Sequence, residues 1–293
     1  MVACDPRIPP RRVGVAVKRN NPDAVLLGRR LLRELARRGV ESVVDADSAA
    51  ALRVKAGPPR PLLGREVDVV IVLGGDGTFL SVTRGCPAAT PVAGINLGTL
   101  GFLTEHAPER TFELLDEILE GRIQVEQRDR LEVQVSGGDG GRRFLVLNDV
   151  VVNKAALARI ATISVTIDGE FLSRYRGDGL ILSTPTGSTA YNLSAGGPIV
   201  FPGLAALLIT PICSHTLADR PLVVPLSSRV EVWLEEGDAE VYLTLDGQLG
   251  FPFLPGMRIA VLPAAEPLTL IRDPASSFFS ILHQKLKWGS REA

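Results

Sequence analysis

The sequence predicts an α/β N-terminal domain with an open, mostly parallel sheet, followed by a β-rich C-terminal domain and a last helix that returns to the first domain. An unbroken apolar run, VDVVIVL at 67–73, predicts a strand buried on both faces. After residue 126 the pattern changes to short β-type runs separated by turn signals. We therefore expect one domain from residues 1–125 with 272–293, and a second from 126–271.

The expected elements of the first domain alternate between strand and helix. Strands are predicted at residues 13–17, 40–44, 67–73 and 92–96, and helices at 24–38 and 108–120. In the second domain, strands are predicted at 131–135, 144–152, 162–167, 179–183, 222–224, 229–234, 241–245 and 258–262. Apolar residues at helical spacing predict the final helix at 277–288.

Composition restricts the classes of function. The 293 residues carry a net charge of −1, with 45% hydrophobic and 22% charged residues, as in an ordinary globular protein. We therefore expect no broad nucleic-acid surface, and no apolar segment is long enough to span a bilayer. The three cysteines lie far apart, which indicates a reducing, cytoplasmic setting, and the three histidines are too dispersed to predict a metal cluster.

The loop Gly74, Gly75, Asp76, Gly77, Thr78 follows the buried strand and precedes a predicted helix start. Glycines permit positive φ and a close backbone approach, and a helix N-terminus attracts phosphate. A carboxylate in such a loop repels phosphate unless it binds Mg²⁺ or accepts a proton from a hydroxyl group. Asp-Gly is also an ordinary turn dipeptide that recurs in this chain, so the loop alone leaves both readings open.

Four further stretches are unusual for plain loops: NLGTLGFLTE at 96–105, LND at 147–149, RGDGLILSTPTGSTAYNLSAGGP at 176–198 and LDGQ at 245–248. The amide and carboxylate within the apolar run at 147–149 need hydrogen-bond partners if they are buried. The third stretch surrounds a single aromatic residue, Tyr191, with small polar groups, which suits a planar base. Neither a P-loop nor a GxGxxG fingerprint is present.

Together, GGDGT, NLGTLGFLTE, LNDVVVNK, GDGLILSTPTGSTAYNLSAGGPI, SHTLADRPLVVP and LDGQ, in this order, resemble the bacterial form of the NAD kinase family. The resemblance covers most of the chain from residue 67 to residue 248. The GGDGT loop alone is less specific, because phosphofructokinases and lipid kinases have a similar turn.

The resemblance implies roles for particular residues. Asp76 matches the catalytic aspartate, which takes the proton of the 2′-hydroxyl of the adenosine ribose. The residues implied to bind nucleotide are Gly74, Gly75, Gly77, Asn148, Asp149, Arg159, Arg176, Asp178, Thr189, Ala190, Tyr191, Asn192, Leu193, Ser194 and Gln248. For Arg159, Arg176 and Asp178, a surface ion pair is an alternative explanation.

The implied reaction is ATP-dependent phosphorylation of NAD⁺ to NADP⁺, with Mg²⁺ or another divalent cation bound to ATP. Polyphosphate is a possible second donor, and a homodimer or homotetramer is expected. Two other functions stay open at this point: a non-catalytic NAD(H)-binding sensor, and a GGDGT-type kinase that acts on a lipid or a sugar.

Overall fold

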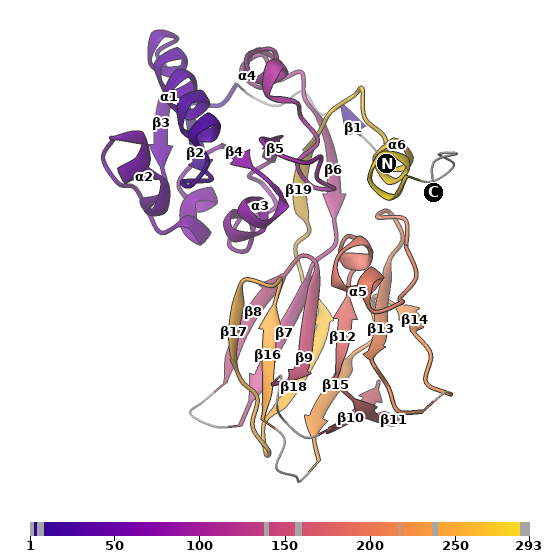
Figure 1. Ribbon diagram of the computed structural model, residues 1–293. Helices are drawn as coiled ribbons and strands as arrows, with labels where there is room; N and C mark the ends of the chain where they lie inside the picture. The colour runs from indigo at the N-terminus through magenta and orange to yellow at the C-terminus, as the bar shows by residue number, and fades with distance from the viewer. Residues whose placement is uncertain are drawn as a thin grey trace. The chain divides into compact units, whose positions relative to one another are not determined.

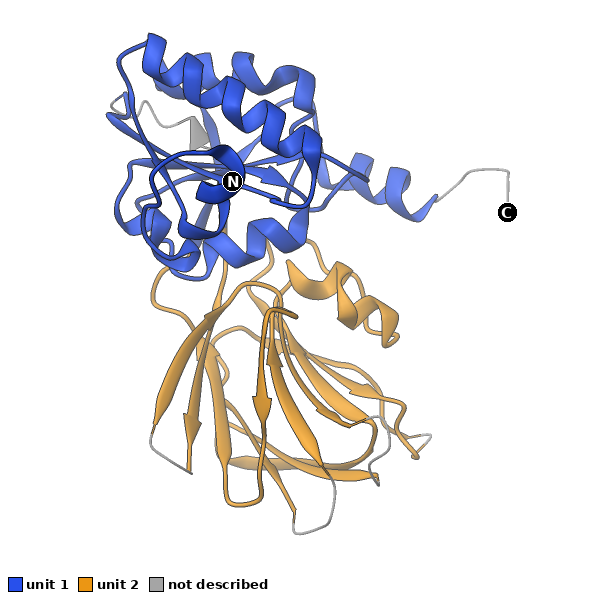
Figure 2. Ribbon diagram, turned by 60° about the vertical axis from the view of Figure 1, so that its left-hand side comes forward, with its two compact units in different colours: residues 1–127, 268–293 blue, residues 128–267 orange. Residues whose placement is uncertain are grey.

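A computed structural model describes residues 9–137, 141–155, 160–216, 218–235 and 240–287, together with the backbone of residues 3 and 4. The chain forms two compact units (Figure 2). Unit 1 contains residues 1–127 and 268–293, and unit 2 contains residues 128–267. The sequence placed the two boundaries at 125/126 and 271/272, so strand 268–272 joins unit 1 rather than unit 2.

Unit 1 is built on one sheet that is mostly parallel (Figure 1). In spatial order the strands are β1 (Ala3–Cys4), β6 (Gln124–Arg128), β19 (Leu268–Arg272), β5 (Val92–Asn96), β4 (Val69–Gly74), β2 (Arg12–Val17) and β3 (Glu41–Val44). Every residue of β4 is buried, because parallel neighbours flank it and helices cover its sheet. The predicted α/β class is confirmed.

The helices of unit 1 are α1 (Pro22–Arg37), α2 (Ala46–Leu52), α3 (Asp76–Thr83), α4 (Thr111–Leu119) and α6 (Phe278–Leu286), with 3₁₀ turns η1 (Arg60–Arg65) and η2 (Pro108–Arg110). Helix α1 begins two residues earlier than predicted, because the Asn21 side chain caps it by accepting the N–H groups of Asp23 and Ala24. Its buried residues follow helical spacing and face the sheet.

Helix α6 belongs to unit 1, as the sequence predicted. Along the chain, the whole of unit 2 lies between this helix and the N-terminal part of unit 1. Ser277 and Ser280 form a capping box that starts the helix. The Phe278 ring then packs against Phe102, with 6.4 Å between ring centroids. The last strand and the last helix are therefore part of the domain that carries the GGDGT loop.

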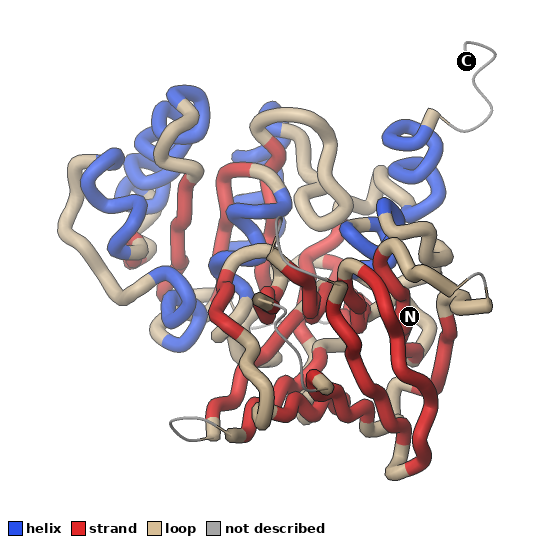
Figure 3. The backbone as a smooth tube through the Cα atoms, turned by 60° about the horizontal axis from the view of Figure 1, so that its bottom comes forward, coloured by secondary structure: helices blue, strands red, loops and turns tan. Residues whose placement is uncertain are grey.

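Unit 2 contains two antiparallel sheets of six strands (Figure 3). The first has the order β11 (Glu170–Gly177), β10 (Ala161–Ile167), β15 (Val230–Leu234), β18 (Arg258–Pro263), β7 (Leu131–Ser136) and β8 (Arg142–Val146). The second has the order β14 (Leu222–Pro225), β13 (Ala206–Ile212), β12 (Gly179–Ser183), β9 (Asp149–Lys154), β16 (Val241–Leu245) and β17 (Leu249–Pro252). One apolar core draws side chains from both sheets, as in a sandwich.

Two features of unit 2 differ from the sequence prediction. The run 144–152 is divided between β8 and β9, because residues 147 and 148 leave the strand and form a tight turn. Strands β11, β13 and β17 were not predicted; β13 is buried along its whole length and has no alternation of polar and apolar residues to mark it. The short helical turns η3 (Gly187–Thr189) and α5 (Tyr191–Ser194) follow β12.

Candidate functional site

The two glycine-bearing loops of unit 1 start at the same edge of the sheet. Strands β4 and β5 are parallel neighbours, and Gly74 at the end of β4 pairs with Asn96 at the end of β5. The carboxyl ends of adjacent parallel strands are the usual position of ligand sites in open α/β sheets. The sequence-predicted loops 74–78 and 96–105 therefore lie together in this unit.

Asp76 is the first residue of α3, not a turn residue. By contrast, Asp168 and Asp246 have positive φ angles of 52° and 51° and form tight turns with the glycines that follow them. The turn explanation of Asp-Gly is therefore correct for Asp168 and Asp246 and wrong for Asp76. Its carboxylate is half-buried and faces the second glycine loop.

The loop that follows β5 surrounds the Asp76 carboxylate with hydrogen-bond donors. The N–H of Phe102 donates to Oδ2 at 2.8 Å, and the N–H groups of Leu103 and Thr104 donate to Oδ1 at 3.1 Å each. The Thr104 hydroxyl adds a fourth bond, to Oδ1 at 3.0 Å. These donors satisfy a fixed negative charge that the sequence marked as anomalous among phosphate-binding amides.

The glycines of the loop 74–78 do not have the backbone conformation expected from the sequence. None of Gly74, Gly75 and Gly77 has a positive φ, so the left-handed backbone predicted for this loop is wrong. Gly74 is instead needed for space, because a Cβ there would come within 2.7 Å of the Thr78 hydroxyl oxygen. Gly75 precedes α3 in an extended conformation, and a Cβ there would meet no described atom within 4 Å.

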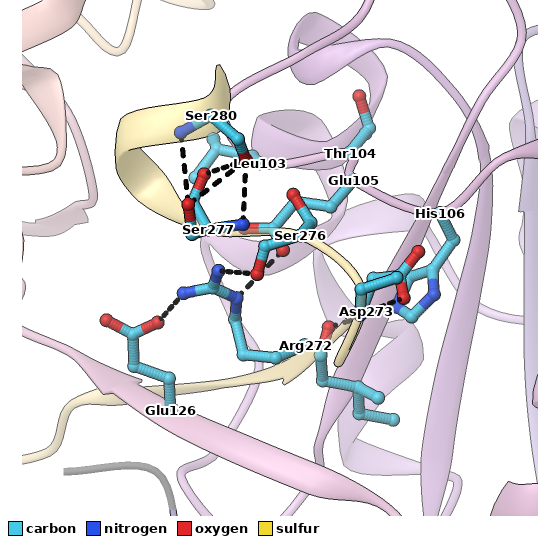
Figure 4. A network of polar contacts seen from close by, with 12 residues as sticks. Leu103, Thr104, Glu105, His106, Glu126, Arg272, Asp273, Ser276, Ser277 and Ser280 are labelled. Atoms are coloured by element: carbon cyan, nitrogen blue, oxygen red, sulfur yellow. Dashed lines mark hydrogen bonds and ion pairs between the residues drawn. The ribbon is translucent and has the colours of Figure 1, made fainter. Parts of the chain in front are cut away.

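An ion network ties the second loop to the end of the chain (Figure 4). The Arg272 guanidinium on β19 lies 2.8 Å from the Glu105 carboxylate and also pairs with Glu126 on β6. The His106 ring contacts the carbonyl oxygen of Ile271 at 3.2 Å. Burial lowers the pKa of His106 below its usual 6.5, so the imidazole is neutral at physiological pH. Residues 103–106 are therefore held by Asp76 at one end and by strand β19 at the other.

In unit 2, the predicted pair Asn148 and Asp149 occupies the turn between β8 and β9. Both side chains are buried, with 8% and 4% exposure. Among the described residues, the Asn148 Oδ1 atom has no hydrogen-bond partner. Burial, and then the nearby Asp246 charge, raise the pKa of Asp149 to about 7. Buried polar groups without protein partners indicate a ligand contact.

Asp246 holds this turn in place. Its carboxylate accepts the N–H groups of Leu147 (3.1 Å) and Asn148 (2.7 Å), and Oδ1 lies 3.3 Å from the Asp149 nitrogen. From the other side, the Thr184 hydroxyl donates to the carbonyl of Leu147 at 2.6 Å. The sequence analysis missed Asp246 as a site residue because its Asp-Gly pair also satisfies an ordinary turn.

The segment 189–194, which the family resemblance implies to bind adenine, runs from the end of η3 through α5. Tyr191 is 44% exposed, whereas Asn192 is fully buried. The Asn192 amide donates to the carbonyls of Ser188 and Pro198, each at 3.0 Å, and accepts from the Thr210 hydroxyl at 2.6 Å. The structure thus gives the Asn192 side chain an internal role that fixes the segment, and its ligand contact stays a prediction.

The remaining predicted residues differ in their surroundings. Asp178 lies 3.5 Å from the Lys154 ammonium, so the ion pair considered for it is present. Arg176 and Gln248 are exposed, and Arg176 forms no ion pair with a described residue. Thr189, Ala190 and Leu193 are half-buried and Ser194 is exposed. Arg159 lies outside the described residues. The ligand contacts of all these residues stay predictions.

Two classes of site are not found in the described part of the chain. It contains no group of three His, Cys, Asp or Glu side chains placed to hold a metal ion. Within those same residues, no helix combines the length and apolar character required to cross a bilayer.

Comparison with known sequences covers both units. The family model described as the ATP-NAD kinase N-terminal domain matches residues 13–123, and that of the ATP-NAD kinase C-terminal domain matches residues 147–273. Over 285 residues, the chain is 47% identical to the NAD kinase of Syntrophobacter fumaroxidans and 42% identical to that of Syntrophotalea carbinolica. These matches cover 95% and 96% of this chain and 99% and 100% of those proteins.

Two solved structures are similar over nearly the whole chain. A yeast NADH kinase complexed with NADH superposes with a TM-score of 0.86 at 27% identity and covers 96% of this chain and 89% of that one. An NAD kinase from Archaeoglobus fulgidus in complex with ATP has a TM-score of 0.74 at 27% identity, with coverage of 94% and 98%.

Proposed function

Because the chain belongs to the NAD kinase family, a family of phosphotransferases, we propose that it transfers the terminal phosphoryl group of ATP to the 2′-hydroxyl of the adenosine ribose of NAD⁺. The products are NADP⁺ and ADP. The observation that carries the proposal is the Asp76 carboxylate, held at the mouth of the parallel sheet by four donors of the neighbouring loop.

In the proposed step, the hydroxyl oxygen of the ribose forms a bond to the γ-phosphorus while the bond from that phosphorus to the bridging oxygen of ADP breaks. Asp76 receives the hydroxyl proton as the new bond forms. Such a transfer depends mainly on positioning and on charge stabilisation. A carboxylate on the first turn of a helix, fixed by backbone N–H groups, is suited to this task because it does not have to reorganise.

The acceptor would be bound through buried polar groups of unit 2, of which the Asn148 amide oxygen has no hydrogen-bond partner among the described residues. The Asn148 amide oxygen and the Asp149 carboxyl are suited to sugar hydroxyls, which donate and accept hydrogen bonds. Exposed Tyr191 offers an aromatic face for stacking with a base.

Mg²⁺ would enter with ATP as part of the substrate. This ion keeps several waters and is usually held by substrate phosphates and one or two carboxylates, not by a dedicated protein cage. The first loop fits that arrangement, because it leads into the N-terminus of α3, where backbone N–H groups suit phosphate. When bound, the ion would neutralise charge on the phosphates.

The decisive test is the substitution Asp76→Asn. The amide oxygen can still accept the bonds from Leu103 and Thr104, whereas the bond from the Phe102 N–H and the base are both lost. We expect turnover to fall by about 10²- to 10⁴-fold, with NAD⁺ binding retained. Production of NADP⁺ is followed with an NADP⁺-specific dehydrogenase, and binding by calorimetry. Near-normal turnover would refute the role of Asp76.

A matched control is Asp68→Asn. Asp68 is an exposed carboxylate of the same unit that accepts the N–H groups of Arg11 and Arg12 at 2.8 Å each. Its turnover should equal that of the wild type. If the wild-type protein binds NAD⁺ but shows no turnover with ATP or polyphosphate, the sensor function is correct instead.

The same assay defines the substrates. The turnover with ATP is compared with that with polyphosphate, and the turnover with NAD⁺ is compared with that with NADH. The homo-oligomer implied by the family stays a prediction, and sedimentation at assay concentration tests it.

A further inference from the structure

The two carboxylate oxygens of Asp76 have different surroundings. Oδ1 accepts three hydrogen bonds, from the N–H groups of Leu103 and Thr104 and from the Thr104 hydroxyl. Oδ2 accepts one, from the N–H of Phe102. A carboxylate has about four lone-pair positions in total, two on each oxygen. Oδ1 is therefore saturated, and Oδ2 keeps one position open for another partner.

The Thr104 hydroxyl is oriented by a second residue. Its side chain is fully buried, and the Asn96 Nδ2 donates to Oγ1 at 3.2 Å. The Asn96 amide is itself fixed, since Nδ2 donates to the carbonyl of Thr99 at 2.7 Å and Oδ1 accepts the N–H of Gly98 at 2.8 Å. Because Thr104 Oγ1 accepts a hydrogen bond from the Asn96 amide, its own hydroxyl proton is directed to Asp76.

The loop also needs a residue without a side chain beside this contact. A Cβ at Gly101 would lie 2.0 Å from Asp76 Oδ1 and 2.2 Å from Thr104 Oγ1. Both distances are far below any allowed contact. The glycine therefore leaves the space in which the carboxylate and the hydroxyl meet.

We propose that Thr104 is a positioning residue of the reaction: its hydroxyl joins the backbone N–H groups of Leu103 and Thr104 at Oδ1 of Asp76 and fixes the orientation of the carboxylate in which Oδ2 receives the proton of the ribose hydroxyl. The inference rests on the proposed function, because it assumes that Asp76 is the base. In the step, the hydroxyl O–H bond breaks, an Oδ2–H bond forms, and the electron pair of the hydroxyl oxygen attacks phosphorus. Thr104 exchanges no proton.

The test compares Thr104→Val, which removes only the hydrogen-bonding group, with Thr104→Ser, which keeps the hydroxyl. We expect Val to lower kcat by about 10- to 100-fold, the usual effect of losing a partner that orients a functional group. KM for NAD⁺ should stay near the wild-type value, because Thr104 contacts the base and not the acceptor. Ser should restore most of kcat.

Thr90→Val is the matched control for burial. Thr90 is a buried threonine of the same unit whose hydroxyl donates to the carbonyl of Gly64 at 2.8 Å, away from Asp76. This variant should keep the wild-type kcat even if it melts at a lower temperature. If Thr104→Val fails to fold, Thr104→Ala against Thr104→Ser isolates the hydroxyl in the same way.

The results separate the two proposals. A wild-type kcat for Thr104→Val, or an equal loss in the Val and Ser variants, would overturn the role of Thr104. Loss of kcat in Asp76→Asn together with a wild-type kcat in Thr104→Val would refute only this inference. A wild-type kcat in Asp76→Asn would refute the proposed function itself.

Discussion

Asp246 lies so close to Asp149 that one of its carboxylate oxygens is 3.3 Å from the Asp149 backbone nitrogen, and its charge helps to raise the pKa of the Asp149 carboxyl to about 7. Asp246 therefore shapes the turn at 147–149 and also disfavours the ionised form of the Asp149 carboxyl group. Protein stability and ligand binding place opposite demands on such a group.

Asp149→Asn should stabilise the unliganded protein above neutral pH. The folded protein holds a proton on Asp149 up to about pH 7, whereas the unfolded chain releases it near 3.8, so the wild type loses stability as pH rises between these values. At about 1.4 kcal/mol for each pKa unit, the effect is of the order of a few kcal/mol. Thermal unfolding from pH 4 to 8 measures the difference between variant and wild type.

The difference in unfolding free energy between Asp149→Asn and the wild type should grow from pH 4 to 7 and then level off. The affinity of the variant for NAD⁺ should fall, because a sugar hydroxyl loses a carboxylate partner. A constant difference over the whole range would mean that Asp149 does not titrate there. Unchanged NAD⁺ affinity would contradict its predicted binding role.

Gly101→Ala should displace the Asp76 carboxylate, because the added methyl group would overlap Oδ1. A shift of about 1 Å in a reacting group can cost about 10²-fold in rate, and we expect a loss of that order in kcat. Steady-state assays together with calorimetric NAD⁺ binding measure it. Gly141→Ala is the control for the change in residue type, since the only described atom near a Cβ there is the carbonyl oxygen of Val135, at 3.9 Å. Wild-type activity in Gly101→Ala would show that the reaction tolerates a displaced Asp76 carboxylate.

Arg272→Met should destabilise unit 1. The substitution leaves the Glu105 and Glu126 carboxylates buried without their shared cation, and the loss of one partner from a buried pair costs about 3–5 kcal/mol. Urea unfolding followed by circular dichroism gives the value. Arg37→Met, at an exposed pair with Glu34, should have little effect because solvent already screens that charge. Equal losses in the two variants would contradict this account of the network.

His106 should make the stability of unit 1 sensitive to mild acid. Burial lowers its pKa in the folded protein, so the unfolded chain binds a proton first as pH falls below about 6.5. Stability is thus complete above that pH and declines below it. His106→Gln keeps a donor for the Ile271 carbonyl and removes the titration, so the variant should lose less stability between pH 7.5 and 5. Parallel unfolding curves for the two proteins would exclude His106 as the source.

Most of the fold could be predicted from local pattern. The unbroken apolar run of β4 and the alternation of β7 and β15 each follow from the face that the strand buries. Strand β19 and the division between β8 and β9 could not, because their places depend on partners far away in the sequence. His106 shows the same limit: its burial depends on contacts with β5 and β19, which are made only when the sheet forms.

For the site, the sequence by itself determined the family, the Asp76 loop and the pair at 147–149, because residue types and their order are local information. Tertiary structure decided which groups act on them. Asp76 meets Thr104 28 residues later, and Asp246 holds Asn148 across 98 residues. Hydrogen bonds depend on distance and direction in space, and separation along the chain carries neither, so these contacts exist only once the sheets have formed.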